Sequence, residues 1–158
     1  MNNLLIGFCI LVILTLSGFA IALKYSKRTS FYKNLQNFNR DFISSISFSN
    51  EDLFFLLSKD YNDESLNQTL KSVIEVIRGN KTAYLYPSFL TNREKEELTR
   101  YFKRLGSFDL NTQLQLLTRF ESVFENIVQN CITSENKEGA LCKKMGIIVG
   151  IMTFIIVV

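Results

Sequence analysis

The stretch LLIGFCILVILTLSGFAIAL, residues 4–23, decides the fold, because it holds twenty residues and not one charge. A helix needs roughly 20 apolar residues to cross a hydrocarbon core of about 30 Å. We therefore predict an N-terminal transmembrane helix and assign it to a first domain, residues 1–24. A cleavable signal peptide is the rival interpretation, because Ala20-Ile21-Ala22 resembles a cleavage site. Signal peptides carry positive charge before the apolar stretch, however, and Met1-Asn2-Asn3 has none.

A second uncharged stretch, MGIIVGIMTFIIVV, occupies residues 145–158. As a helix its fourteen residues would cover about 21 Å, less than the thickness of the core. We expect a short transmembrane or membrane-inserted segment, and the sequence leaves both open. Each apolar stretch carries small residues four apart, Gly18 with Ala22 and Gly146 with Gly150, a spacing that lets helices approach closely in lipid. This spacing predicts that the two segments pack on each other or make contacts in a homo-oligomer.

Basic residues flank the region between the two apolar stretches on both sides. Lys24, Lys27 and Arg28 follow the first stretch, and Lys143 and Lys144 precede the second. Basic loop ends stay on the cytoplasmic side of a membrane. We therefore expect residues 25–144 in the cytoplasm and both chain termini outside it.

The middle domain, residues 25–144, is predicted to be a helical bundle. Its apolar residues recur three and four positions apart, as in amphipathic helices, and the chain has a single proline. Three stripes follow this spacing: Phe31, Leu35, Phe38, Phe42 and Ile46; Leu66, Leu70, Val73, Ile74 and Ile77; and Leu110, Leu114, Leu117, Phe120, Phe124, Ile127, Val128 and Cys131. We therefore expect an all-α protein.

Helix-end signals support the same assignment. The predicted ends are the capping-box pairs Ser49 with Asp52 and Thr91 with Glu94, and a stop at Gly79-Asn80. From Asp109 the helical pattern continues as far as Gly139. We expect one long helix there that leads into the C-terminal apolar segment.

A tight corner is predicted where Leu105-Gly106 is followed by Asp109 and Gln113. Glycine takes the left-handed conformation after a helix, and aspartate caps the start of the next one. Capping accounts for Gly106 and Asp109 without a partner. Gln113 has no such structural role, so it is the candidate for a partner contact.

The chain lacks the residues and motifs on which most catalytic and metal sites depend. It has no histidine, no phosphate-binding glycine motif, and three cysteines without metal-site spacing. We expect no enzyme activity, cofactor, metal, nucleic acid or small-molecule substrate. Arg100, Lys103 and Arg104 form either a basic patch for an acidic partner or an ordinary solvated helix face.

Three motifs resemble one known family. They are LTLSGFAIA with KYSKR, residues 14–22 and 24–28; the L-G-x-x-D-x-x-x-Q corner; and KMGIIVG, residues 144–150. In this order they resemble the stage III sporulation protein AB family, over nearly the whole chain. The chain departs from that family after Leu35-Gln36, where Asn39 and Asp41 stand in place of the usual glutamates.

The resemblance implies a location and a partner. Members sit in the mother-cell membrane around the engulfed forespore, in the complex that links the two cells. Their cytoplasmic domain is similar to the helical domains of type II secretion F proteins. By that analogy the protein would be a platform that holds the cytoplasmic ATPase of the same sporulation operon at the membrane, beside other membrane components.

A second hypothesis is a membrane-anchored regulatory or sensor protein that recruits a soluble signalling partner. It would need the same membrane segments but no ATPase. Neighbouring genes would separate the two hypotheses, because a platform protein should be encoded beside an ATPase.

Overall fold

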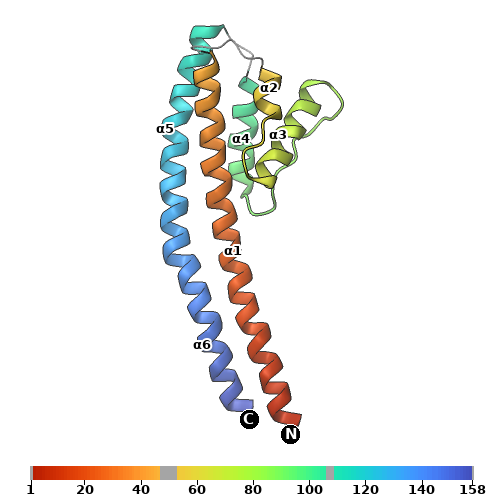
Figure 1. Cartoon of the computed structure of the whole chain (residues 1–158), viewed down its shortest axis with the longest axis vertical. Helices are drawn as coiled ribbons and strands as arrows, with labels where there is room; N and C mark the ends of the chain where they lie inside the picture. Colours follow the sequence, from red (N-terminus) through yellow and green to blue (C-terminus); the bar gives the residue numbers. More distant parts are fainter. Residues whose placement is uncertain (1, 47–52, 106–108, 158) are drawn as a thin grey trace. The chain divides into compact units, whose positions relative to one another are not determined.

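The structure is a computed structural model that describes residues 2–46, 53–105 and 109–157. These residues form helices and no strand, which confirms the all-α prediction (Figure 1). In chain order the helices are α1 (Asn2–Ser44), α2 (Leu53–Ser58), α3 (Glu64–Ile77), α4 (Asn92–Arg104), α5 (Leu110–Ser134), the π-helix η2 (Glu135–Gly139) and α6 (Ala140–Val157).

The chain divides into two compact units. The helix-pair unit consists of Met1–Thr29 with Gln129–Val158, and the bundle unit consists of Ser30–Val128. Helices α1 and α5 contribute residues to both units. The limits predicted at 24/25 and 144/145 follow the apolar stretches instead, and as membrane boundaries they stay predictions.

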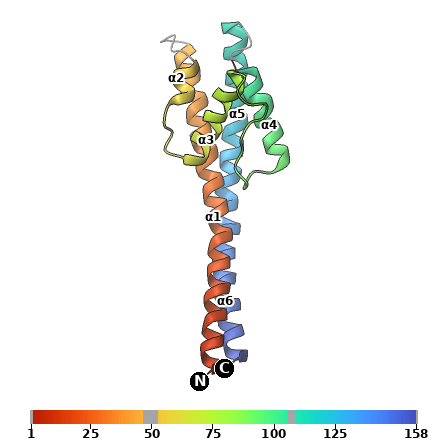
Figure 2. The same cartoon turned by 90° about the vertical axis from the view of Figure 1, so that its right-hand side faces the viewer.

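In the helix-pair unit, α1 and α6 lie side by side, with the first turn of α1 near the last turn of α6 (Figures 1 and 2). A Cβ atom on Gly18 would lie 2.7 Å from the carbonyl oxygen of Cys142 and 3.0 Å from the Cα of Gly146. A Cβ on Gly150 would lie 3.3 Å from the carbonyl oxygen of Leu11. The small residues therefore let the two backbones touch, where larger side chains would hold them apart.

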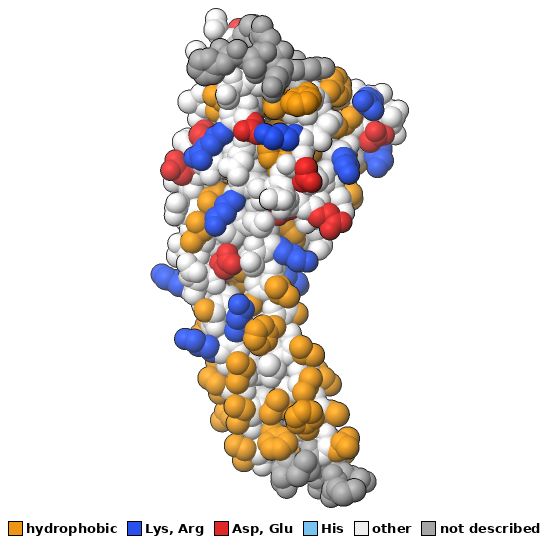
Figure 3. Space-filling view, viewed as in Figure 1, with side chains coloured by type: hydrophobic (Ala, Val, Ile, Leu, Met, Phe, Trp, Pro, Cys, Tyr) orange, Lys and Arg blue, Asp and Glu red, His pale blue; other side chains and the backbone are white. Residues whose placement is uncertain are grey.

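The outer surface of the helix-pair unit is apolar. Leu5 is 66% exposed, Ile155 69% and Ile156 83%, and Figure 3 shows hydrophobic side chains gathered on the surface of this unit. Among the residues that the structure describes, two helical stretches, Leu5–Ser44 and Asn111–Val157, are long and apolar enough to cross a membrane. Because so large an apolar surface is unfavourable in water, these stretches indicate membrane association.

The predicted long helix from Asp109 is present, with one change of geometry. The α-helix gives way to a π-helix at Glu135–Gly139 and resumes in α6. A π-turn widens a helix to hold one more residue without breaking it. Glu138 of this π-helix forms a side-chain hydrogen bond with Tyr25 of α1. This bond is the largest of several causes that raise the pKa of Tyr25.

The core of the bundle unit is built from one face of each helix. Its fully or nearly fully buried apolar residues include Phe31, Leu35, Phe38 and Phe42 of α1; Leu56 and Leu57 of α2; Leu66, Leu70 and Val73 of α3; Leu98, Tyr101 and Phe102 of α4; and Leu117 and Phe124 of α5. Most described residues of the predicted stripes therefore face the core. Ile77 at the end of α3 is 43% exposed, and Phe120 and Ile127 of α5 are only half-buried.

The helix ends agree with the sequence signals that fall on described residues. Thr91 and Glu94 form the predicted capping box at the start of α4. Gly79, with φ of 78°, follows the end of α3 in the left-handed conformation that glycine adopts readily. The N-cap of α3 is Asp63, which accepts from the backbone N–H of Leu66 and was not predicted. The predicted pair Ser49 and Asp52 lies outside the described residues.

Asn39 is the buried polar centre of the bundle unit, with 0% of the residue exposed. The hydroxyl of Tyr101 on α4 donates to its Oδ1 at 3.0 Å. Its Nδ2 donates to two oxygens of α5, the carbonyl of Leu117 at 3.1 Å and Oε2 of Glu121 at 3.0 Å. Because unpaired buried polar groups are costly, these bonds fix the register of α1 against α4 and α5.

Glu121 is held by two further residues of α1. Its Oε1 accepts from Nε2 of Gln36 at 2.9 Å and from Nε of Arg40 at 2.6 Å. Burial is the main reason that the pKa of Tyr101 lies well above its ordinary value. The tyrosine hydroxyl therefore stays protonated and keeps its role as a donor to Asn39.

We predict that Thr15→Cys with Gly150→Cys forms a disulfide within one chain when the three native cysteines are replaced by serine. A Cβ on Gly150 would lie 3.4 Å from Oγ1 of Thr15, within the reach of a disulfide. Mobility on a non-reducing gel measures it. Adding Gly18→Leu should abolish the bond by separating the helices.

The matched control is Ile13→Cys with Gly150→Cys, which should stay reduced. Ile13 is 65% exposed, and two positions along a helix it points away from the side where Thr15 lies. Disulfides that form only between chains would instead assign the small residues to an oligomer contact.

Asn39→Ala should lower the free energy of unfolding by about 2 kcal/mol or more, because it leaves the buried Tyr101 hydroxyl without its acceptor. Urea denaturation of the full chain in detergent, followed by far-ultraviolet circular dichroism, measures the change. Asn126→Ala is the control, because the one hydrogen bond of that exposed side chain among the described residues goes to the Ser122 carbonyl of its own helix. Equal losses of unfolding free energy in the two variants would contradict the stabilising role of the Asn39 hydrogen bonds.

Candidate functional site

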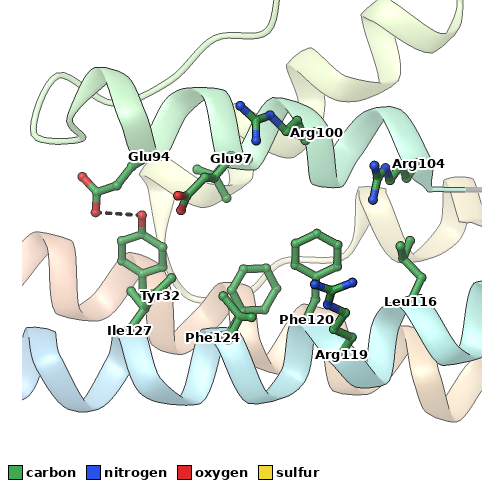
Figure 4. Close-up of a pocket in the computed structure, with 12 residues that line it drawn as sticks. Tyr32, Glu94, Glu97, Arg100, Arg104, Leu116, Arg119, Phe120, Phe124 and Ile127 are labelled. Carbon is green, nitrogen blue, oxygen red and sulfur yellow. Dashed lines mark hydrogen bonds between the residues drawn. The ribbon is translucent and has the colours of Figure 1, made fainter.

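A groove of about 410 Å³ runs between α4 and α5 in the bundle unit (Figure 4). Figure 4 shows Tyr32 of α1 and Glu94 at one end beside Ile127, and Arg104 with Leu116 at the other. The residues that line it are Tyr32, Glu94, Glu97, Leu98, Arg100, Arg104, Leu116, Arg119, Phe120, Val123, Phe124 and Ile127. The wall from α4 is mostly charged, and the wall from α5 is mostly apolar.

The apolar wall exists because α5 carries two neighbouring rows of apolar residues. One row, with Leu117, Phe124 and Val128, is buried in the core. The next row around the helix contains Leu116, Phe120, Val123 and Ile127, spaced four, three and four apart, so it shares one face. This second row is only partly covered, and Val123 is 38% exposed.

Aromatic contacts hold the two walls of the groove together. The ring of Tyr101 on α4 meets the rings of Phe120 and Phe124 edge-on, with centroids 4.8 and 5.2 Å apart. Edge-to-face pairs of this kind add to the energy of apolar burial. The floor of the groove is therefore a fixed surface of the bundle.

The charges of the groove are separated along its length. Glu94 accepts from the hydroxyl of Tyr32 at 2.8 Å and from the backbone N–H of Thr91 at 2.8 Å, so it is engaged in holding the start of α4. Glu97 pairs with the exposed Arg93 at 3.3 Å, a weak surface pair. Toward the other end the charges are positive.

Three exposed arginines, Arg100, Arg104 and Arg119, lie along the positive part of the groove. Within residues 2–46, 53–105 and 109–157, none of their guanidinium groups has an ion pair or hydrogen bond. Both carboxylates of the groove are already engaged, so this arrangement suits binding through apolar contact and positive charge. In the same part of the chain no cluster of three or more His, Cys, Asp or Glu residues could hold a metal ion.

The structure changes the predicted basic patch. Arg100 and Arg104 line the groove, Lys103 does not, and Arg119 from α5 does. Arg119 lies fifteen positions beyond Arg104 in the sequence, and no local spacing connects the two. Only the pairing of α4 with α5 brings Arg119 into the same groove.

The sequence model of one family, described as stage III sporulation protein AB, matches residues 3–158. The chain belongs to the stage III sporulation protein AB family. Searches of curated proteins and of solved structures found no match. The likeness to type II secretion F domains therefore stays a prediction from the resemblance.

The corner motif that resembles the stage III sporulation protein AB family lies next to the groove in the sequence, between Arg104 and Leu116. Leu105 is 5% exposed, and Gly106 lies outside the described residues. The Asp109 side chain accepts from the backbone N–H of Thr112 at 3.2 Å, the geometry of an N-cap of α5. Hydrogen bonds from Thr112 lower the pKa of Asp109, which favours the charged form that suits a helix start.

Gln113 is buried, with 3% of the residue exposed. Neither Nε2 nor Oε1 of its amide has a hydrogen-bond partner among the residues that the structure describes. A surface contact does not fit this burial. Buried unpaired polar atoms are rare in folded proteins and costly, so the Gln113 amide lowers the stability of the bundle unit.

The other predicted residues of this family member lie in the helix-pair unit. Gly18, Ala22, Gly146 and Gly150 lie at or near the contact between α1 and α6. The side chains of Lys24, Lys27, Lys143 and Lys144 are exposed, and Arg28 is partly covered. The Nζ atom of Lys143 lies 6.0 Å from the ring centre of Phe19.

Gln113→Met should raise the free energy of unfolding by about 1 kcal/mol, because a side chain of similar shape replaces two unpaired polar atoms. Thermal unfolding of the full chain in detergent measures this. Gln115→Met, the same change at an exposed position of α5, should have little effect. A loss of stability in Gln113→Met would mean that the amide has a partner. Fewer spores from a stabilised Gln113→Met protein would assign the amide a functional role.

Proposed function

We propose that this member of the stage III sporulation protein AB family is a non-catalytic membrane platform of the channel complex between mother cell and forespore. The helix-pair unit anchors it in the mother-cell membrane around the forespore. The bundle unit holds a cytoplasmic ATPase of the same operon at that membrane. The family match supports a role in sporulation, and the rest of the proposal goes beyond that match.

The observation that carries the proposal is the close packing of α1 on α6. Gly18 and Gly146 bring the two helix backbones into contact, while the outward side chains of both helices are apolar and exposed. Two helices packed in this way form one anchor for a domain that lies between them in the sequence. Such an anchor suits a protein that must keep a soluble partner at the membrane.

The basic residues support the orientation. Lys24, Lys27 and Arg28 on α1 and Lys143 and Lys144 on α6 all lie at the ends of the apolar stretches that lead to the bundle unit in the sequence. By the positive-inside rule, the bundle unit lies in the cytoplasm and both chain termini lie outside. In this proposal the described corner residues Leu105, Asp109 and Gln113 shape the bundle end where a partner binds.

We expect a cytoplasmic ATPase to co-purify with the full chain from sporulating cells in mild detergent. An affinity tag fits in the exposed loop at residues 79–83, where an insertion leaves the helices intact. Mass spectrometry identifies the recovered proteins. A matched chain in which a flexible linker replaces residues 30–128 keeps the helix pair and should recover no ATPase.

Two results would contradict the proposal. Equal recovery of the ATPase by the matched chain would place the binding in the membrane and not in the bundle. Recovery of a soluble regulator without any ATPase would favour the sensor hypothesis, with the anchors unchanged.

A further inference from the structure

The floor of the α4–α5 groove is an apolar surface that nothing in the described chain covers. Phe120 and Ile127 are half-buried, and Val123 is 38% exposed between them. These side chains form one continuous row on α5, since they are spaced three and four positions apart. A continuous apolar row with a charged rim is typical of a surface that binds another protein.

The rim of the groove supplies a charge pattern for the partner. Arg100 and Arg104 are one turn apart on α4, and Arg119 faces the same groove from α5 (Figure 4). Like charges four positions apart on a helix repel each other, and no carboxylate among the described residues pairs with these three. The groove is therefore complementary to a surface that carries several carboxylates.

The length of the groove fits a short α-helix of the partner. The α4 wall from Glu94 to Arg104 rises about 15 Å, and the α5 wall from Leu116 to Ile127 rises about 16 Å. About three turns of an α-helix have the same length. Helices bind in such grooves through apolar side chains at positions i, i+3 or i+4, and i+7.

We propose that the groove binds an acidic amphipathic helix of a soluble protein. The apolar face of that helix packs on Phe120, Val123 and Ile127, and its carboxylates pair with Arg100, Arg104 and Arg119. Glu94 and Glu97 at the other end repel carboxylates, so the acidic part of the guest helix lies toward Arg104. This assignment rests on the proposed function in one respect, because it gives the bundle unit its binding surface for a soluble partner.

The probe for this proposal is a labelled synthetic peptide of about four helical turns, with leucines on one face and glutamates beside them. The full chain in neutral lipid nanodiscs should bind it, as measured by fluorescence polarisation. A control peptide with lysine in place of each glutamate should bind about tenfold more weakly or worse, since close charge pairs contribute strongly across an interface. Rising salt should weaken the binding of the acidic peptide.

Variants of the groove provide the decisive comparison. Arg100→Glu with Arg104→Glu should reduce the affinity for the acidic peptide by about tenfold or more. Lys71→Glu with Lys81→Glu makes the same change in net charge at exposed positions outside the groove and should leave the affinity unchanged. Arg100→Gln with Arg104→Gln gives an intermediate loss and serves if the reversed charges disturb the fold, which circular dichroism reports.

Several outcomes would overturn the proposal. These are equal binding of the two peptides, equal binding by the groove and control variants, or no binding of the acidic peptide. Binding of ATP or of phosphatidylglycerol vesicles that the groove variants abolish, without peptide binding, would assign the groove to a nucleotide or a lipid. If the groove binds the peptide but the chain recovers no ATPase from cells, this inference is supported and the proposed function is contradicted.

Discussion

The hydrogen bonds of Asn39 are the constraint on which the bundle depends. Apolar contacts between helices tolerate many side-chain combinations and small shifts, whereas a buried amide must meet its partners at fixed positions. Asn39 meets Tyr101 of α4 and two oxygens of α5. The ring of the same Tyr101 contacts Phe120 and Phe124 in the floor of the groove. The distance between the groove walls is therefore set from inside the core.

Much of the fold could be predicted because its signals are local. The period of apolar residues follows from helix geometry and requires no knowledge of distant parts of the chain. The capping box of Thr91 and Glu94 and the left-handed Gly79 lie within a few residues of the helix ends that they mark. The small residues Gly18 and Gly146 likewise predict a close helix contact, although their spacing alone does not say which helix is the partner.

The parts that could not be predicted depend on contacts between distant residues. Asn39 interrupts an apolar stripe, and from the sequence alone a polar residue there is expected to destabilise the core. Only the structure shows that Tyr101 and Glu121 form hydrogen bonds with it. Arg119 joins Arg100 only through the pairing of two helices. The burial of Gln113 is also invisible in the sequence, where a glutamine is most often exposed. Arg119 lines the groove, and Asn39 positions the Tyr101 ring that contacts the groove floor. The site was therefore less predictable than the fold.

The contact between Gly18 and Gly146 has a mechanical consequence. A single helix in a fluid bilayer can spin about its own axis with little resistance, so it transmits force along the membrane normal but hardly any twist. Two helices in backbone contact can turn only together, about an axis that runs between them. In a bilayer, a domain joined to both helices could not rotate about the axis of either helix alone. The absence of two side chains would therefore remove a rotation that a single-helix anchor allows.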